Sequence, residues 1–199
     1  MTAPIILASR SRIRAEILAN AGVAVHISPA PVDEAAAHEA ATRNPISPPQ
    51  LAAQLAEAKA RAVAAANPGT LVIGADQVLS LDGELFSKPP SMAAAAGQLR
   101  RLRGTTHRLD TAFACVRDER LVARQVDGAK LTMRYFSEDF LDAYLQAAGP
   151  RIVDSVGGYQ FEGIGAQLFE RVEGDYYTIL GLPLLPLLAV LRGEGLLPT

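Results

Sequence analysis

The chain has 199 residues, of which 49% are hydrophobic and 20% charged, so it is long and apolar enough to bury a sizeable globular core. Its formal net charge of −2 predicts no general attraction to nucleic acid or to an anionic membrane surface. The single cysteine, Cys115, excludes a disulfide framework within the chain and fits a reducing cytoplasm. No apolar run reaches the roughly 20 residues that a membrane-spanning helix needs. We therefore expect one cytoplasmic domain over 1–199, with 193–199 as a frayed tail.

A short apolar run at 4–8 predicts a strand, followed by a tight turn and a helix that ends near Gly22. Three arginines crowd the start of that helix, namely Arg10, Arg12 and Arg14. Cations oppose the helix dipole at this end. The pattern therefore favours an anion bound at the helix start about as strongly as it favours three solvated arginines.

The next part of the chain predicts little regular structure. A strand is expected over 23–27, and the stretch 28–49 is rich in proline and alanine without a clear period. This stretch carries one acidic pair, Asp33 and Glu34. Two such carboxylates in a loop are by themselves typical of solvated side chains.

A long helix is expected from Ser47, its cap, to about Ala66. Lys59 falls inside the apolar stripe of that helix, between Leu55 and Val63. A lysine on a buried stripe either extends its amine to solvent or points it into a functional site. The pattern alone favours the first alternative slightly.

The most unusual stretch follows, at 71–89. It predicts a strand that carries one carboxylate, Asp76, then a hairpin turn, and then Lys88 ahead of two prolines. A charge inside so apolar a strand is costly unless it is paired or binds a metal. Gly74 on the same face favours the close approach of a ligand. The alternative is an aspartate held at a strand end by backbone N–H groups.

The rest of the chain alternates between capped helices and strands. The expected elements are a helix over 91–102, two antiparallel strands over 106–116 and 121–135, a helix over 137–148, a hairpin of 166–172 with 176–180, and a last helix over 182–191. Between them, the glycine-rich stretch 155–165 lets backbone approach a flat or phosphorylated ligand, although it matches neither a P-loop nor a dinucleotide-binding fingerprint.

Four motifs follow one another along the chain: ILASRSRIRAEIL near the N-terminus, LAEAKA, VIGADQV with a later SKP, and GGYQFEGIGAQLFERVEGDYYTILGLPL. Together they resemble the Maf family of nucleoside triphosphate pyrophosphatases. The resemblance covers nearly the whole chain. It implies an α/β fold like that of inosine triphosphate pyrophosphatases, with a mixed twisted sheet flanked by helices and two lobes around a nucleotide cleft. The implied reaction converts a nucleoside triphosphate to the monophosphate and pyrophosphate with Mg²⁺ or Mn²⁺.

Carried over residue by residue, the resemblance makes Asp76 the catalytic proton acceptor and, together with Glu34, a ligand of the divalent metal. Water that attacks the α-phosphorus needs activation, so Asp76 could act as base, as metal ligand, or as both. A triphosphate brings about four negative charges, which cations must neutralise in a chain that is acidic overall. The residues that would hold the triphosphate are Ser9, Arg14 and the catalytic lysines Lys59 and Lys88.

The resemblance also assigns three base-binding positions, which are Ile13, Gln77 and Glu162 here. Family members that act on dTTP and UTP have Arg, Thr and Gln there, and those that act on 7-methyl-GTP have Trp, Gln and Glu, so this chain is closer to the second type. A carboxylate at Glu162 suits the N–H donors of a guanine edge. Ile13 cannot supply the cation–π attraction of a tryptophan to a methylated guanine. We expect a guanine-like purine, with weakened selection for the methyl group.

Asp76 and Gln77 are neighbours, and in a regular strand they face opposite sides of the sheet. Both can serve one site only if the strand ends or bulges at this pair, and we expect such a break. Regular pairing through both residues would keep Gln77 from the base.

Two other functions remain open. The chain could be a nucleotide-binding regulator of cell division or septation with little hydrolysis, rather than a house-cleaning enzyme of the nucleotide pool. It could also be an inosine or xanthosine triphosphate pyrophosphatase, although Glu162 suits the xanthine carbonyl less well. No basic run supports nucleic-acid binding, and a homodimer is one of the oligomeric states left open.

Overall fold

The computed structural model describes residues 5–43 and 46–198, so Pro4, at the start of the first predicted strand, lies outside the described residues. The strands are β1 (Ile5–Leu7), β2 (His26–Ile27), β3 (Leu71–Leu81), β4 (Glu84–Phe86), β5 (Thr106–Arg117), β6 (Arg120–Met133) and β7 (Phe169–Glu173). In the described part of the chain they form one seven-stranded sheet in the order β2-β1-β3-β5-β6-β7, with β4 paired to β3. Strand β1 pairs in parallel with β2 and β3, and the other pairs are antiparallel.

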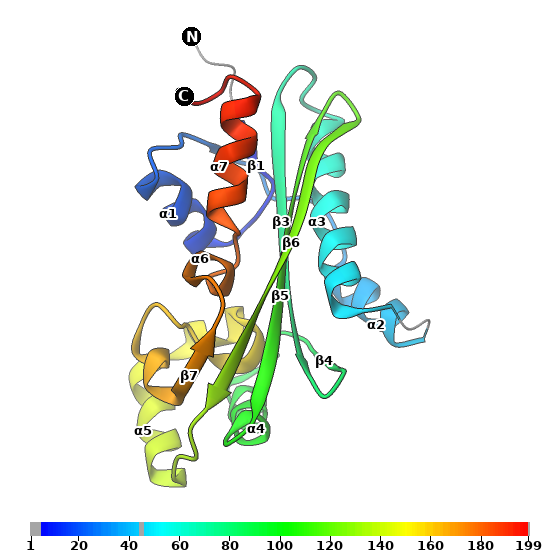
Figure 1. The fold of residues 1–199 in the computed structure, drawn as a ribbon. Helices are drawn as coiled ribbons and strands as arrows, with labels where there is room; N and C mark the ends of the chain where they lie inside the picture. Colours follow the sequence, from blue (N-terminus) through cyan, green and yellow to red (C-terminus); the bar gives the residue numbers. More distant parts are fainter. Residues whose placement is uncertain (1–4, 44–45, 199) are drawn as a thin grey trace.

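Helices flank this sheet on both faces. They are α1 (Arg12–Asn20), α2 (Glu34–Arg43), α3 (Pro48–Ala64), α4 (Met92–Leu102), α5 (Glu138–Ala148), α6 (Tyr176–Ile179) and α7 (Leu184–Gly193). Figure 1 shows α2 and α3 on one side of the long strands, α1 and α7 on the other, and α4 and α5 at the end near β7. The predicted mixed sheet flanked by helices is confirmed.

The helix starts that the sequence predicts are set by local caps. Ser91 and Ser137 accept hydrogen bonds from backbone N–H groups three residues later, at 3.2 and 3.1 Å. Ser11 caps α1 in the same way. At Ser47 the backbone N–H donates to Gln50 Oε1 at 3.0 Å, with Pro48 at the first helical position.

Two expectations about local structure are wrong. The stretch 28–49, expected to be irregular, contains α2, because Asp33 Oδ1 accepts from the Ala36 N–H at 3.0 Å and starts the helix. The expected hairpin of 166–172 with 176–180 does not form, because β7 pairs with β6 and the second segment is the short helix α6. Its start is fixed by Asp175 Oδ2, which accepts from the Thr178 N–H at 2.7 Å.

Within residues 5–43 and 46–198, the core consists of three clusters of buried apolar side chains, and β3 and β5 contribute to all three. One cluster lies beneath α1 and α7, one beneath α3, and one beside α4 and α5. Leu196, in the segment expected to be a frayed tail, is only 7% exposed and packs in the first of these clusters. None of the helices in the described ranges combines the length and the apolar character that crossing a membrane requires.

Candidate functional site

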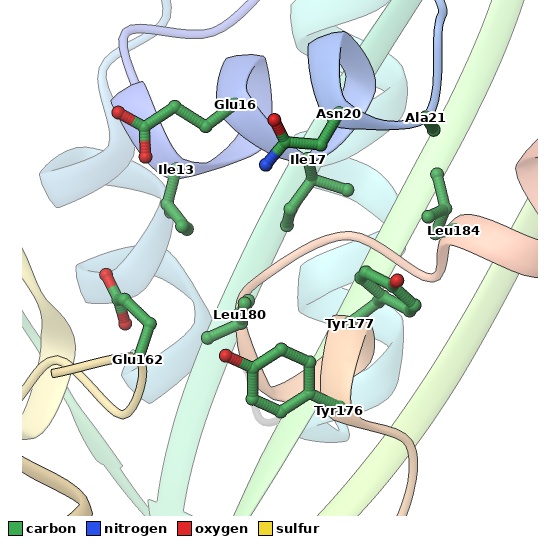
Figure 2. Close-up of a pocket in the computed structure, with 10 residues that line it drawn as sticks. All are labelled: Ile13, Glu16, Ile17, Asn20, Ala21, Glu162, Tyr176, Tyr177, Leu180 and Leu184. Atoms are coloured by element: carbon green, nitrogen blue, oxygen red, sulfur yellow. The ribbon is translucent and has the colours of Figure 1, made fainter.

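A pocket of about 390 Å³ opens between α1, α6 and the glycine-rich stretch 155–165 (Figure 2). It brings together Ile13 and Glu162, which the sequence places at base-binding positions. Tyr176 was not among the residues predicted to bind the base, because a strand was expected there. The two adjacent tyrosines after Asp175 are the sequence feature that could have indicated it. The residues that line the pocket are Ile13, Glu16, Ile17, Asn20, Ala21, Glu162, Tyr176, Tyr177, Leu180 and Leu184.

Gln77 does not line this pocket. Its Nε2 donates to the carbonyls of Thr178 and Ile179 at 3.1 and 3.0 Å, and it lies 2.9 Å from Thr111 Oγ1. The pairing of β3 with β5 is regular through Asp76 and Gln77, so the expected break in the strand is wrong. The two side chains face opposite sides of the sheet, and Gln77 anchors α6 to the central strands.

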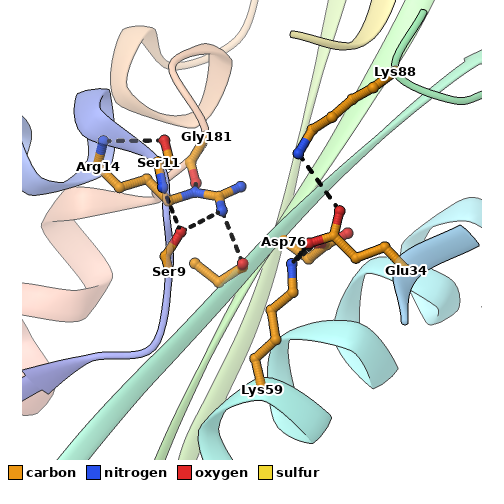
Figure 3. A network of polar contacts seen from close by, with 9 residues as sticks. Ser9, Ser11, Arg14, Glu34, Lys59, Asp76, Lys88 and Gly181 are labelled. Atoms are coloured by element: carbon orange, nitrogen blue, oxygen red, sulfur yellow. Dashed lines mark hydrogen bonds and ion pairs between the residues drawn. The ribbon is translucent and has the colours of Figure 1, made fainter. Parts of the chain in front are cut away.

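Arg14 follows Ile13 on α1 and lies beside a second group of polar side chains. Its guanidinium Nε donates to Gly181 O at 2.7 Å, and its Nη1 donates to Ala75 O at 2.9 Å and to Ser9 Oγ at 3.2 Å (Figure 3). The residue is 9% exposed. Burial lowers the pKa of Arg14 below its usual range, against the charges of Asp76 and Glu34, which raise it. Arg14 therefore ties α1 and the segment after α6 to β3, beside Asp76.

The crowding of arginines at the start of α1 is thus partly explained without an anion. Arg14 turns inward onto backbone carbonyls, and Arg12 pairs with Glu16 on the surface, where their Nε and Oε1 atoms are 2.5 Å apart. Ser9 Oγ accepts from the Ser11 N–H at 3.1 Å as well as from Arg14. Ser9 is therefore held at the turn that begins α1.

Four charged residues meet on the α3 side of β3, and we call them the ionic cluster: Glu34, Lys59, Asp76 and Lys88 (Figure 3). Lys59 Nζ lies 2.5 Å from Asp76 Oδ1 and 2.6 Å from Glu34 Oε1. Lys88 Nζ lies 3.5 Å from Glu34 Oε2. The side chains of Lys59 and Asp76 are each 7% exposed. Lys59 points its amine into the cluster, so the expectation that it extends to solvent is wrong.

Gly74 explains why Lys59 reaches Asp76. A Cβ atom at Gly74 would lie 2.1 Å from Ala56 O and 2.7 Å from Ala60 N, both in the backbone of α3. The helix therefore crosses β3 in direct backbone contact, and Lys59 lies on α3 at this crossing. The expectation that Gly74 leaves room for a ligand is wrong, because α3 fills that space.

The charges of the cluster act on Glu34 as well. Burial alone would raise the pKa of its carboxyl group, but Lys59, Lys88 and Arg14 outweigh this effect and lower the pKa to about 2. Glu34 is therefore ionised at neutral pH.

The two carboxylates of the cluster converge on one point, because Asp76 and Glu34 both contact Lys59 Nζ. Mg²⁺ is commonly bound by one or two carboxylates together with substrate phosphates and water. The pair fits this pattern. Within the described residues, no group of three or more His, Cys, Asp or Glu side chains could hold a metal by itself.

Comparison with known proteins identifies the family. A family model described as Maf-like protein matches residues 4–194. The chain belongs to the Maf family. A nucleoside triphosphate pyrophosphatase of Nitrobacter hamburgensis is 52% identical over 194 residues, which are 98% of this chain and 95% of the relative. A 7-methyl-GTP pyrophosphatase of Rhizobium etli is 48% identical over 195 residues, 98% of each chain.

The solved structure of a HAM1 protein from Coxiella burnetii aligns with a TM-score of 0.41 and 16% identity, over 66% of this chain and 73% of that one. A similarity this weak supports no conclusion about the fold or the function of this chain.

In this Maf-family chain, the residues assigned from sequence thus fall into three neighbouring places. The ionic cluster gathers the carboxylates and lysines, Ser9 and Arg14 form a hydrogen-bonded pair beside it, and Ile13 and Glu162 line the pocket. Gln77 lies apart from these three places and supports α6 through its hydrogen bonds.

Proposed function

We propose that the chain hydrolyses a nucleoside triphosphate to the monophosphate and pyrophosphate, with a guanine-like purine as the preferred base. The observation that carries this proposal is the contact between the buried Asp76 carboxylate and Lys59, which Glu34 shares. The cluster combines an acceptor for the proton of attacking water with two cations for a polyphosphate. The names of the relatives that are 52% and 48% identical support the same reaction.

Binding of the triphosphate exchanges the partners of the lysines. Lys88 is half-exposed and has a 3.5 Å contact with Glu34, so its amine moves to a phosphate oxygen at little cost. Lys59 moves its amine from the two carboxylates towards the substrate and frees Asp76 and Glu34. Arg14 stays on its carbonyl partners and keeps Ser9 in place beside the phosphates.

Asp76 then takes the proton of the water that attacks the α-phosphorus, and pyrophosphate leaves. Asp76 and Glu34 would hold Mg²⁺ or Mn²⁺, which when bound neutralises phosphate charge and polarises the phosphoryl oxygens. Before the triphosphate binds, Lys59 pairs with Asp76, with its Nζ 2.5 Å from Oδ1.

The base enters the pocket beside Ile13, where Glu162 accepts hydrogen bonds from the N1–H and N2–H groups of guanine. Uracil and thymine offer only one N–H donor, and it lies between two carbonyl groups. The Glu162 carboxylate repels the oxygens of these carbonyl groups. The name of the Rhizobium etli relative supports a guanine-type substrate. Gln77 does not contact the base in this proposal. It holds α6, which carries Tyr176 and Tyr177 at the pocket.

A turnover panel tests this function. GTP, 7-methyl-GTP, ITP, XTP, dTTP and UTP are supplied with Mg²⁺ or Mn²⁺, and pyrophosphate and orthophosphate are measured separately. We expect pyrophosphate as the product, with GTP or 7-methyl-GTP as the best substrate and a requirement for the metal. If dTTP or UTP turned over fastest, the role of Glu162 would be wrong. Tight nucleotide binding without pyrophosphate release would favour a regulatory protein. We also propose that the reaction takes place in the cytoplasm, because the single cysteine, Cys115, fits a reducing compartment.

A further inference from the structure

Tyr176 presents an aromatic ring at the pocket without burying it. The residue is 48% exposed, although it lines the same pocket as Ile13 and Glu162. Its ring centroid lies 6.2 Å from that of Phe161, at an interplanar angle of 59°, and 5.8 Å from that of Tyr177, at 69°. Neither contact is a parallel stack, and nearly half of the residue is exposed, so part of the ring is available to a ligand.

The backbone beneath this ring is also fixed. Asp175 caps the short helix by accepting from the Thr178 N–H at 2.7 Å. Thr111 Oγ1 donates to Thr178 O at 2.9 Å, and Gln77 donates to the carbonyls of Thr178 and Ile179. The segment that carries Tyr176 is therefore attached to both β3 and β5, so its ring is positioned before any ligand arrives.

Of the two aromatic residues that line the pocket, Tyr176 is the more exposed. On the α1 side the pocket is formed by Ile13 and Ile17, and Leu180 and Leu184 continue the aliphatic lining. Tyr177 is half-buried and packs against the core beneath α1 and α7. In Figure 2 the ring of Tyr176 lies across the pocket from Glu16 and Asn20. A planar base whose edge reaches Glu162 has Tyr176 as its aromatic neighbour.

We propose that Tyr176 is a specificity-determining residue whose ring stacks on the purine of the substrate. This inference rests on the proposed function, because it takes the pocket to be the site of the base. The ring supplies the aromatic face that Ile13 lacks. A guanine that carries a 7-methyl group is positively charged, so the same face attracts it by a cation–π interaction. Tyr176 thereby favours the methylated base over unmodified guanine.

The test compares Tyr176→Leu, which removes the aromatic face, with Tyr176→Phe, which keeps it. Dissociation constants are measured by calorimetry for analogues of GTP and 7-methyl-GTP in which a methylene group replaces the oxygen between the α- and β-phosphorus atoms. Inorganic triphosphate is the third ligand, because it has no base. Tyr135→Leu is the matched control, since Tyr135 is 80% exposed and contacts Arg103 rather than the pocket.

We expect Tyr176→Leu to weaken binding of the GTP analogue about tenfold, and of the 7-methyl analogue several-fold more. Binding of inorganic triphosphate should not change. Tyr176→Phe and Tyr135→Leu should stay within about twofold of the unsubstituted protein for all three ligands.

Other results overturn the inference. Unchanged binding of both analogues by Tyr176→Leu would show that the ring does not contact the base, even if pyrophosphate release confirmed the enzyme. Equal weakening of inorganic triphosphate would show a structural effect on the whole site. A third outcome separates the two proposals. If Tyr176→Leu weakened binding of both analogues, but the unsubstituted protein released no pyrophosphate from GTP or 7-methyl-GTP, the proposed reaction would fail and the inference would stand.

Discussion

The ammonium of Lys59 is the residue-scale feature on which the site depends. It is buried, and it is shared between Asp76 and Glu34 at 2.5 and 2.6 Å. Removing one partner of a buried ion pair leaves an uncompensated charge and typically costs about 3–5 kcal/mol. Here the second carboxylate limits that cost, because Lys59 keeps one partner when the other is lost. Because the lysine is shared, substitution of either Asp76 or Glu34 still leaves it with one carboxylate partner.

Glu34→Gln tests this electrostatic arrangement through its pH dependence. The pKa of Glu34 is lowered to about 2 from an ordinary value of 4.5. Its ion pairs therefore stabilise the fold fully above about pH 4.5, and this contribution disappears as the pH falls towards 2. We expect Glu34→Gln to lower the free energy of unfolding at neutral pH and to reduce its decline in that acid range, as measured by urea unfolding.

The matched control for that experiment is Glu39→Gln. Glu39 lies on the same helix, and its contact with Arg43 is an exposed pair at 3.7 Å. Exposed pairs contribute about 0–1 kcal/mol, so this substitution should change little. If the free energy of unfolding of Glu34→Gln fell in acid as steeply as that of the unsubstituted protein, the assigned pKa of Glu34 would be wrong.

At the scale of elements, the crossing of α3 over β3 sets the geometry of the ionic cluster. Gly74→Ala places a Cβ atom 2.1 Å from Ala56 O, so α3 must shift away from the strand. We expect a loss of about 1–3 kcal/mol in the free energy of unfolding. Because the shift separates Lys59 from Asp76, turnover should also fall, by about 10- to 100-fold.

Gly97→Ala is the control in this case. Gly97 lies inside α4, and a Cβ atom there would have no neighbour within 4 Å. Alanine is the better helix former, so this variant should gain about 0.5–1 kcal/mol and keep its turnover. Full stability and turnover in Gly74→Ala would show that α3 does not set the position of Lys59.

The elements also show what could be predicted from the sequence. Helices with a serine cap, such as those that begin after Ser47, Ser91 and Ser137, were predicted because the signals are local. The helix at Tyr176 was misread, because two tyrosines, a threonine and an isoleucine favour a strand over so few residues. Its helical state is decided by a cap and by bonds from distant strands, which no local pattern contains.

The candidate site was predictable to a similar degree. The alternation rule alone places Asp76 and Gln77 on opposite faces, as the structure has them, and the added expectation of a bulge was wrong. The direction of Lys59 could not be derived from its helix, because it depends on how closely Gly74 lets α3 approach. The direction of Lys59 is therefore decided by a contact between elements, which no local pattern contains.

On the scale of the whole molecule, the three core clusters share the same two central strands. Strands β3 and β5 contribute buried side chains to each cluster, so the loss of either strand would open the entire core. We expect a single cooperative unfolding transition, in which far-UV circular dichroism and tyrosine fluorescence change at the same denaturant concentration. Two separated transitions would instead indicate two lobes that unfold independently.

Three of the chain's 19 lysines and arginines lie where the proposed function places the triphosphate. The formal net charge is −2, yet Lys59 and Lys88 lie in the ionic cluster and Arg14 lies beside it. In the proposed function, substrate binding depends on these local groups and not on a general attraction, and catalysis depends on Asp76.

The most direct measurement is pyrophosphate release by Asp76→Asn, together with binding of the methylene analogue of GTP. We predict that release falls at least about 100-fold, as expected for loss of a general base, while binding stays within a few-fold. Circular dichroism shows whether the variant remains folded. We expect it to fold, because Lys59 keeps its ion pair with Glu34. Near-full turnover in a folded Asp76→Asn protein would contradict the assignment of the ionic cluster as the catalytic site.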